Sequence, residues 1–260
     1  MPYVIVTALE QWAPIGTDER GGLLQLRRWA QRLDDLDGQP TTSPEDLSWG
    51  GRIRHIDIGS IGMQSDRLVS RHEAWTRAEN AMTRAFWLAA QHARGGSVGL
   101  AYGHGHAAGR EAWIDLAPMG ILRVDHSFFQ GYAAVKDGTD SSRGLDRKEQ
   151  LFELLGSVWS NRPRPGRIEL YSCGVGASRR GRSLLDWIHY YWRVPIRALV
   201  GDLEVSGNQR NPSVVPEVRV LPPRASRRGG EPRVWRDQLI TDPRLWARSR
   251  RRRPDRGSAP

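Results

Sequence analysis

Short apolar runs recur along the chain, and longer segments between them carry apolar residues at a helical period. Short runs bounded by glycine or polar residues predict buried strands. These runs occupy residues 3–9, 52–59, 97–103, 112–117, 167–173, 194–201 and 217–221. Their mostly continuous apolar character is typical of strands that are covered on both faces of a parallel sheet.

Helical periodicity occupies the segments between these runs. Apolar residues recur along one face in four segments that we expect to be helices, at 22–36, 66–93, 147–160 and 183–192. Residues 119–129 follow neither pattern, and residues 133–146 are polar and predict a loop. Strands that alternate with helices predict an α/β protein, with a mostly parallel sheet and helices on both of its faces.

The charge of the chain is concentrated at its carboxyl end. The 260 residues carry a formal net charge of +10, and residues 224–260 hold twelve arginines against four acidic residues. We therefore expect one domain over residues 1–223, followed by an Arg- and Pro-rich tail. The basic residues at 244–256 predict either binding to an acidic partner or a nucleic acid, or a solvated and mobile terminus.

Two further features bear on where the protein works. Cys173 is the single cysteine, which excludes a disulfide within the chain and fits a reducing compartment. No apolar stretch has the length of a membrane span, and the first residues, MPYVIVTALEQW, lack the basic start of a signal peptide. We expect a cytoplasmic protein without a membrane span.

Two glycine-rich motifs follow predicted strands. AYGHGHAAG (101–109) brings two histidines after one strand, and YSCGVGAS (171–178) brings Cys173 at the end of another. In parallel sheets, sites form at the carboxyl ends of strands. If these two strands are parallel neighbours, His104 and Cys173 leave the sheet side by side at the same edge.

Cys173 and His104 suit nucleophilic catalysis, and each also has a structural interpretation. Glycines after Cys173 allow close approach to the backbone, and a helix start with Arg179 and Arg180 favours a thiolate. His104 can act as the base, and the backbone amides of Gly105 and Cys173 can bind an oxyanion. A lone cysteine at a strand end is also typical of a small buried apolar side chain, and a lone histidine of a hydrogen-bonded structural residue.

The two motifs together resemble a known family. LAYGHG (100–105) followed by IELYSCG (168–174) is similar to the caspase-like cysteine peptidases, which include caspases, legumains, gingipains and self-cleaving toxin domains. The segment 168–201 looks most like bacterial caspase-related domains, in which a strand ending in cysteine is followed by a glycine turn, a helix and another strand. The resemblance covers roughly residues 52–205.

The resemblance implies a three-layer αβα sandwich and a cysteine endopeptidase with a His104–Cys173 dyad, in a bacterial defence, effector or self-processing system. It implies a protein or peptide substrate, and neither a cofactor nor a metal. One departure is Ser172, which stands where many members have alanine. A second hypothesis, from another class, is a catalytically silent caspase-like interaction module that engages an acidic partner through the basic tail.

Carboxylates and further histidines near the motifs provide two more expectations. A peptidase that cleaves after Arg or Lys needs an acid in its primary pocket; Asp202 and Asp115 are the candidates, with a surface or turn carboxylate as the alternative. His104 and His106 are two residues apart, so in an extended segment both point the same way and suit a metal. The side chains that could complete such a site are Asp115, Asp125 and His126. The third hypothesis is therefore a metal-dependent hydrolase.

Overall fold

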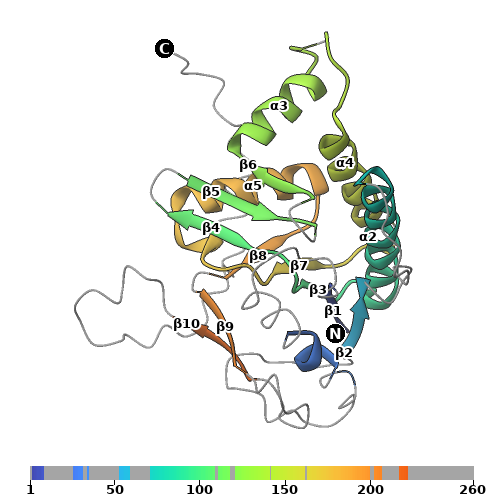
Figure 1. Cartoon of the computed structure of the whole chain (residues 1–260), viewed down its shortest axis with the longest axis vertical. Coiled ribbons are helices and arrows are strands. Elements are labelled where there is room, and N and C mark those ends of the chain that lie inside the picture. The colour runs from blue at the N-terminus through green and yellow to red at the C-terminus, as the bar shows by residue number, and fades with distance from the viewer. Residues whose placement is uncertain are drawn as a thin grey trace, which may run out of the picture.

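The computed structural model contains a five-stranded parallel sheet, a three-stranded antiparallel sheet and a two-stranded ribbon (Figure 1). The residues that it describes are 2–8, 26–31, 34, 53–58, 71–108, 111–117, 121–140, 142–161, 163–199, 202–206 and 217–221. Over these ranges the chain is an α/β protein, as the alternation of strand and helix patterns predicted.

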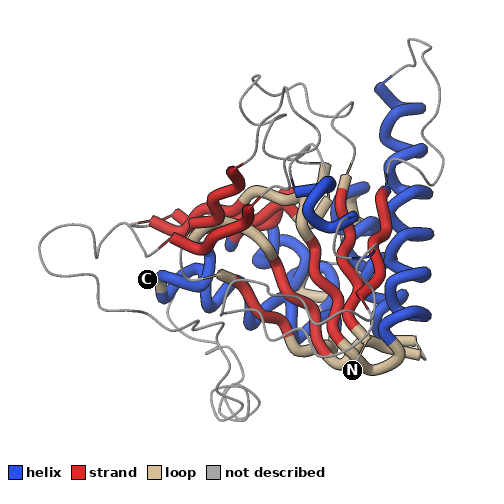
Figure 2. Tube along the Cα trace, turned by 90° about the horizontal axis from the view of Figure 1, so that it is seen from below, coloured by secondary structure: helices blue, strands red, loops and turns tan. Residues whose placement is uncertain are grey.

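The central sheet has the strand order β2–β1–β3–β7–β8. The bounds of these strands, in that order, are Ile53–Asp57, Tyr3–Thr7, Ser97–Leu100, Arg167–Leu170 and Ile196–Ala198. All four neighbouring pairs are parallel, and the strands lie side by side in Figure 2. The predicted parallel sheet is therefore confirmed, although β3 and β7 end three residues earlier than the apolar runs that predicted them.

Four helices have described bounds: α2 (Arg71–Ala93), α3 (His126–Lys136), α4 (Arg147–Ser160) and α5 (Arg179–Trp192). Residues 26–31 are also helical, within the helix predicted at 22–36. The helices α2, α4 and α5 lie along one side of the central sheet, and α3 projects beyond its end (Figure 1). Parallel strands need such crossover helices, because a tight turn cannot connect them.

The two faces of the central sheet bury different side chains. One face packs against α2, α4 and α5 through the aliphatic residues Val4, Val6, Val98, Leu100, Ile168, Leu170, Ile196 and Ala198. The other face forms a smaller cluster from Ile5, Ile53, Ala101 and Tyr171 with Leu26, Trp29 and Ala30 of the helical residues 26–31. Strand alternation also places buried polar residues on this second face, namely Thr7, Asp57, Ser97 and Glu169.

The three-stranded sheet was only partly predicted. It consists of β4 (Gly105–Ala108), β5 (Glu111–Asp115) and β6 (Arg123–Asp125), all antiparallel. The sequence indicated β5, but not β4, because the glycine and the two alanines of β4 have low strand propensity. The ribbon pairs β9 (Asp202–Ser206) with β10 (Glu217–Leu221), so the strand expected at 217–221 is confirmed.

The loop expected at 133–146 is shorter than predicted. Helix α3 continues to Lys136, because AAVK contains good helix formers, and the connection to α4 begins at Asp137. Arg143 within this connection donates to both oxygens of the buried Glu149, at 2.9 and 2.8 Å. Asp146 caps α4 by accepting from the Glu149 amide at 2.9 Å. The connection is therefore anchored to α4 rather than being a plain polar loop.

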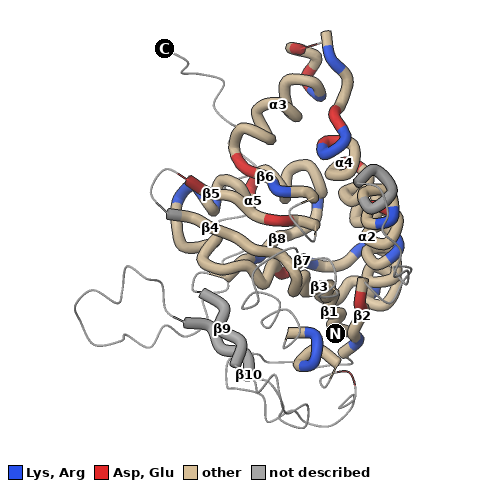
Figure 3. The backbone as a smooth tube through the Cα atoms, viewed as in Figure 1, with Lys and Arg blue, Asp and Glu red and all other residues tan. Residues whose placement is uncertain are grey.

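Charges of both signs are interspersed over the described elements in Figure 3. This agrees with the small net charge that the sequence assigns to residues 1–223. The tail that carries most of the charge lies outside the described residues. Its predicted binding to an acidic partner or a nucleic acid stays a prediction. Within the described ranges, no helix combines the length and the apolar character that crossing a membrane requires.

Candidate active site at the ends of two central strands

The carboxyl ends of β3 and β7 meet at one edge of the central sheet. The two strands are hydrogen-bonded parallel neighbours, with Leu100 opposite Leu170. His104 follows Leu100 by four residues and Cys173 follows Leu170 by three, so both lie just beyond the same edge. The predicted adjacency of the two strands is therefore confirmed.

Hydrogen bonds join the two strand extensions beyond this edge. The amide of Tyr171 donates to the last carbonyl of β3 at 3.0 Å, and the hydroxyl of Ser172 donates to the Gly103 carbonyl at 3.2 Å. The residues that immediately precede His104 and Cys173 are thus bonded to each other. Sequence reasoning treated Ser172 only as a departure from the family pattern and missed this contact. A small polar residue at the end of an apolar run is the signal that could have indicated it.

Gly105 is tightly packed against the segment that carries Cys173. A Cβ atom at Gly105 would lie 2.3 Å from Cγ2 of Val175 and 2.8 Å from Cβ of Ser172. Glycine is needed here because the turn that carries Cys173 packs directly against the backbone that follows His104. This close approach brings the two motifs together from a second direction.

The backbone amide of Gly105 is directed away from its partner strand. The Asp115 amide donates to the His104 carbonyl at 2.8 Å, and Gly105 lies opposite Ile114. In an antiparallel ladder, this pattern makes Gly105 and Ile114 a non-hydrogen-bonded pair, so the Gly105 N–H points away from β5. An oxyanion hole needs an amide that its own sheet does not use. The role of the Gly105 and Cys173 amides stays a prediction.

His104 carries a buried ring nitrogen that the protein does not satisfy. Its side chain is half-buried, and Nε2 is shielded from solvent without a hydrogen-bond partner. Leaving a buried polar atom unpaired costs about 1–3 kcal/mol, so such atoms need an explanation. A fully hydrogen-bonded structural histidine does not describe this nitrogen.

Cys173 is half-buried in the turn between β7 and α5. Gly174 adopts φ +60°, in the left-handed region that favours glycine. A 3-10 turn, η4 (Val175–Ala177), then separates Cys173 from α5. The helix start predicted to adjoin the thiol therefore lies one short turn further along the chain, where Arg179 and Arg180 are exposed.

The two carboxylates predicted to bind substrate have different surroundings. Both oxygens of the buried Asp115 accept from Arg123, at 2.8 and 3.1 Å, and the Arg123 guanidinium lies 3.8 Å from the centre of the Trp113 ring. The bonds to Asp115 raise the pKa of Arg123. Asp115 is therefore already paired with a cation of its own chain. Asp202 begins β9, and its side chain lies outside what the structure describes, so its role stays a prediction.

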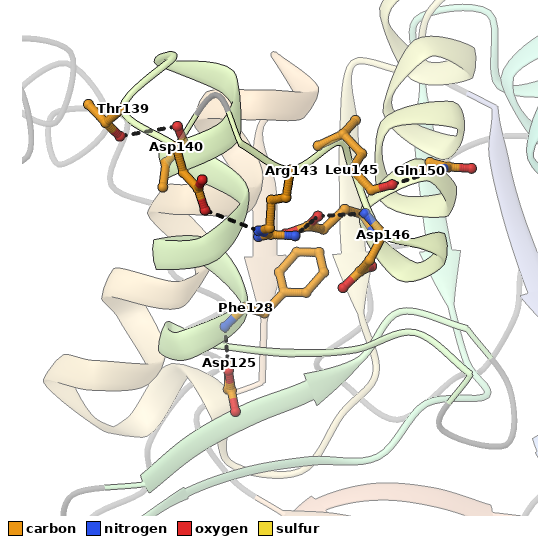
Figure 4. Close-up of polar contacts among 10 residues, drawn as sticks. Asp125, Phe128, Thr139, Asp140, Arg143, Leu145, Asp146 and Gln150 are labelled. Carbon is orange, nitrogen blue, oxygen red and sulfur yellow. Dashed lines mark hydrogen bonds and ion pairs between the residues drawn. The ribbon is translucent and has the colours of Figure 1, made fainter.

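Several of the residues proposed for a metal site have other contacts. His106 is exposed and stacks against Trp113, with ring centres 6.1 Å apart. Asp125 caps α3 by accepting from a backbone amide at 2.8 Å (Figure 4). Burial, and after it the charge of Arg180, lowers the pKa of His126. Among the described residues, no group of three His, Cys, Asp or Glu side chains is arranged to hold a metal ion.

Comparison with known proteins finds no relative. No protein-family model, no curated protein and no solved structure matches the chain. The resemblance to caspase-like peptidases therefore rests on the two short motifs and on their order along the chain.

Proposed function

We propose that this protein is a caspase-like cysteine peptidase in which Cys173 is the nucleophile and His104 is the base. The observation that carries the proposal is the pairing of β3 with β7, extended by the bond between Ser172 and the Gly103 carbonyl. This pairing brings the segments that carry Cys173 and His104 to the same edge of the sheet, where α/β sheets form their sites.

The proposal includes a three-layer αβα sandwich. It is supported by α2, α4 and α5 on one face of the central sheet, and by the helical residues 26–31, which contribute Leu26, Trp29 and Ala30 to the other face. The strand order β2–β1–β3–β7–β8 is of the doubly wound type, which binds ligands at strand carboxyl ends.

In the proposed reaction, His104 removes the proton from the Cys173 thiol, and the sulfur attacks the carbonyl carbon of a peptide bond. The carbonyl electrons move to oxygen, where the amides of Gly105 and Cys173 donate to the oxyanion. The C–N bond then breaks as His104 returns the proton to the leaving amine. Water, deprotonated by His104, cleaves the resulting thioester and restores the thiol.

The proposal is tested with the full-length chain and two measurements. Iodoacetamide labels the single thiol, and the labelling rate is measured against pH. We expect the midpoint of this pH dependence to lie below the value of about 8.5 for an unperturbed cysteine and to move in His104→Ala. Cleavage of denatured casein should fall by about 10³-fold or more in Cys173→Ala and His104→Ala. His106→Ala is the matched control, because this exposed histidine two residues away should leave both measurements unchanged.

Three other results would contradict the proposal. Cleavage that persists in Cys173→Ala and is blocked by EDTA would support a metal-dependent hydrolase instead. An ordinary thiol midpoint that does not respond to His104→Ala would rule out the dyad. If that result were combined with no casein cleavage by the wild-type chain, the interaction module would be the better account.

A further inference from the structure

A chain of hydrogen bonds crosses the face of the sheet opposite to α2, α4 and α5. The Tyr3 hydroxyl donates to Oε2 of Glu169 at 2.6 Å, and the hydroxyls of Tyr3 and Tyr171 lie 2.8 Å apart. A hydroxyl has one proton and a carboxylate only accepts, so Tyr171 must donate to Tyr3. The chain therefore runs from Tyr171, just after β7, to Tyr3 in β1, and then to Glu169 within β7.

Gly99 makes room for this chain. Tyr3 belongs to β1 and Tyr171 follows β7, with β3 lying between these two strands. A Cβ atom at Gly99 would lie 2.7 Å from Cε2 of Tyr171 and 2.8 Å from the hydroxyl oxygen of Tyr3. The two rings thus meet over a residue of β3 that has no side chain. We call Tyr3, Gly99, Glu169 and Tyr171 together the tyrosine bridge.

The tyrosine bridge ends on a carboxylate between two arginines. Oε1 of Glu169 lies 2.7 Å from Nε of Arg167 and 3.8 Å from Nη1 of Arg197, and the closer contact lacks hydrogen-bond geometry. The bond from Tyr3 is therefore the well-aligned one at this carboxylate. Burial, and after it the neighbouring Tyr171 and Glu169, raises the pKa of Tyr3; burial also raises the pKa of Tyr171. Both hydroxyls thus keep their protons at neutral pH.

The tyrosine bridge connects to Cys173 through two residues of backbone. Tyr171 is held on one side of the strand extension, and the next residue, Ser172, bonds to the Gly103 carbonyl. Cys173 follows directly, so the positions of Tyr171 and Ser172 fix the backbone from which the Cys173 side chain extends. A displacement of about 1 Å at a reacting group can cost about 10²-fold in rate. Small movements of Tyr171 are therefore expected to displace the Cys173 thiol and to lower its rate of reaction.

We propose that the tyrosine bridge is a positioning device for Cys173, which ties the end of β7 to β1 across β3 and so sets the distance between the thiol and His104. The inference rests on the proposed dyad and extends it to residues that touch neither the substrate nor the reacting atoms. Its members are positioning residues, and their effect on the thiol has to pass through His104.

The test measures the iodoacetamide labelling rate of Cys173 against pH in the full-length chain. We expect Tyr3→Phe and Tyr171→Phe to move the pH midpoint toward that of His104→Ala, and to lower the rate at pH 7 by about tenfold. Tyr132→Phe, which alters a buried tyrosine in α3, is the control and should leave the midpoint and the rate unchanged. Thermal unfolding of each variant separates lost stability from a shifted midpoint.

The deciding variant combines Tyr3→Phe with His104→Ala. A device that acts through the dyad has no further effect once the imidazole is gone, so the double variant should match His104→Ala alone. The positioning role of the tyrosine bridge would be wrong, and the dyad would remain, in either of two cases. In the first, Tyr3→Phe has the same effect in the His104→Ala background as in the wild-type chain. In the second, the midpoints of the single tyrosine variants do not move while that of His104→Ala does. A wild-type midpoint that ignores His104→Ala would overturn both. If Tyr3→Phe does not fold, Tyr171→Phe replaces it in both the single and the double variant, because it removes only the last hydrogen bond of the tyrosine bridge.

Discussion

The same five strands supply both faces of the central sheet, yet the faces are built from different chemistry. Toward α2, α4 and α5, the strands present aliphatic residues, which meet large buried aromatic rings such as Phe86, Trp159 and Trp192. Toward the helical residues 26–31, they present a mixture in which Tyr3 and Glu169 form bonds between strands.

The difference teaches that the two faces contribute in different ways. We call the face toward α2, α4 and α5 the helical face, and the face toward residues 26–31 the polar face. Burying apolar area is worth about 25 cal/mol per Å², so the helical face supplies most of the free energy of folding. A buried polar network contributes little net stability, but each bond fixes one geometry and is expensive to break on one side. We infer that the first face stabilises the sheet and the second sets the relative position of its strands.

The largest expected effect tests the helical face. Phe86 is fully buried, with its ring centre 4.4 Å from that of Trp159. Phe86→Ala should therefore lower the free energy of unfolding by about 3–5 kcal/mol, measured by urea denaturation. Its neighbour Trp87 is 54% exposed, so Trp87→Ala should change stability by no more than about 0.5 kcal/mol. Similar losses in both variants would mean that the helical face does not dominate stability.

A smaller loss is expected on the polar face. Glu169→Ala removes the acceptor of Tyr3 and leaves Arg167 and Arg197 without their carboxylate, which should cost about 2 kcal/mol. The half-exposed Glu153, which pairs with Lys136 on the surface, is the control, and Glu153→Ala should cost less than about 1 kcal/mol. Urea denaturation of both variants gives the comparison. A Glu169 variant as stable as the control would show that the polar face carries no network.

Two glycines allow the faces to be compared directly. Alanine at Gly156 would place its Cβ 2.5 Å from Cδ1 of the buried Trp192, and alanine at Gly99 would meet both tyrosines of the bridge. Overpacking should cost each variant about 1–2 kcal/mol, even though alanine favours the helix at 156. Gly144 has open space around it, so Gly144→Ala is the control with little change. Only Gly99→Ala should also shift the labelling midpoint of Cys173.

The last expected effect appears only at alkaline pH. Burial raises the pKa of Tyr3 and Tyr171 on the polar face, and raises that of Tyr191 beside α3 and α4 to about 12. A tyrosine whose pKa is higher in the folded than in the unfolded protein contributes its full stability to the fold below about pH 10, the pKa of an unfolded tyrosine. Above pH 10 the unfolded tyrosine loses its proton first, so this stability is lost as the pH rises. Each such tyrosine should contribute a fall of about 1.4 kcal/mol per pH unit.

The measurement is the free energy of unfolding between pH 10 and 12. In Tyr3→Phe and in Tyr191→Phe, the free energy of unfolding should fall less steeply with pH, because one tyrosine no longer contributes to the fall. For Tyr191 the fall should level off near pH 12, where the pKa of this tyrosine lies in the folded protein. Identical profiles for wild type and Tyr3→Phe would mean that Tyr3 is accessible to hydroxide, contrary to its burial.

The sequence predicted the helical face better than the polar face for a physical reason. Apolar periodicity reports burial, so β1, β3, β7 and the helices α2, α4 and α5 could be placed from the pattern of residues such as Val4 and Ile168. Glu169 interrupts an apolar run, and a single sequence does not reveal that its partner is Tyr3, more than a hundred residues away. Pairings of this kind depend on strand order, which local patterns do not encode.

The candidate site shows the same division. The positions of His104 and Cys173 at neighbouring strand ends followed from two local motifs and from the geometry of parallel sheets. The contact of Ser172 with Gly103 and the packing of Gly105 against Val175 depend on atoms that meet only after folding. Sequence alone does not distinguish a glycine that faces a ligand from one that faces another backbone.

The glycine under the tyrosine bridge has a consequence for how such a sequence can evolve. A larger residue at Gly99 would collide with Tyr3 and Tyr171 together, so it is acceptable only after one of those rings has been replaced by a smaller side chain. Once position 99 has been filled, the original tyrosine is excluded in turn. The three positions should therefore change together among related sequences, in a fixed order in which a ring is lost before the glycine is.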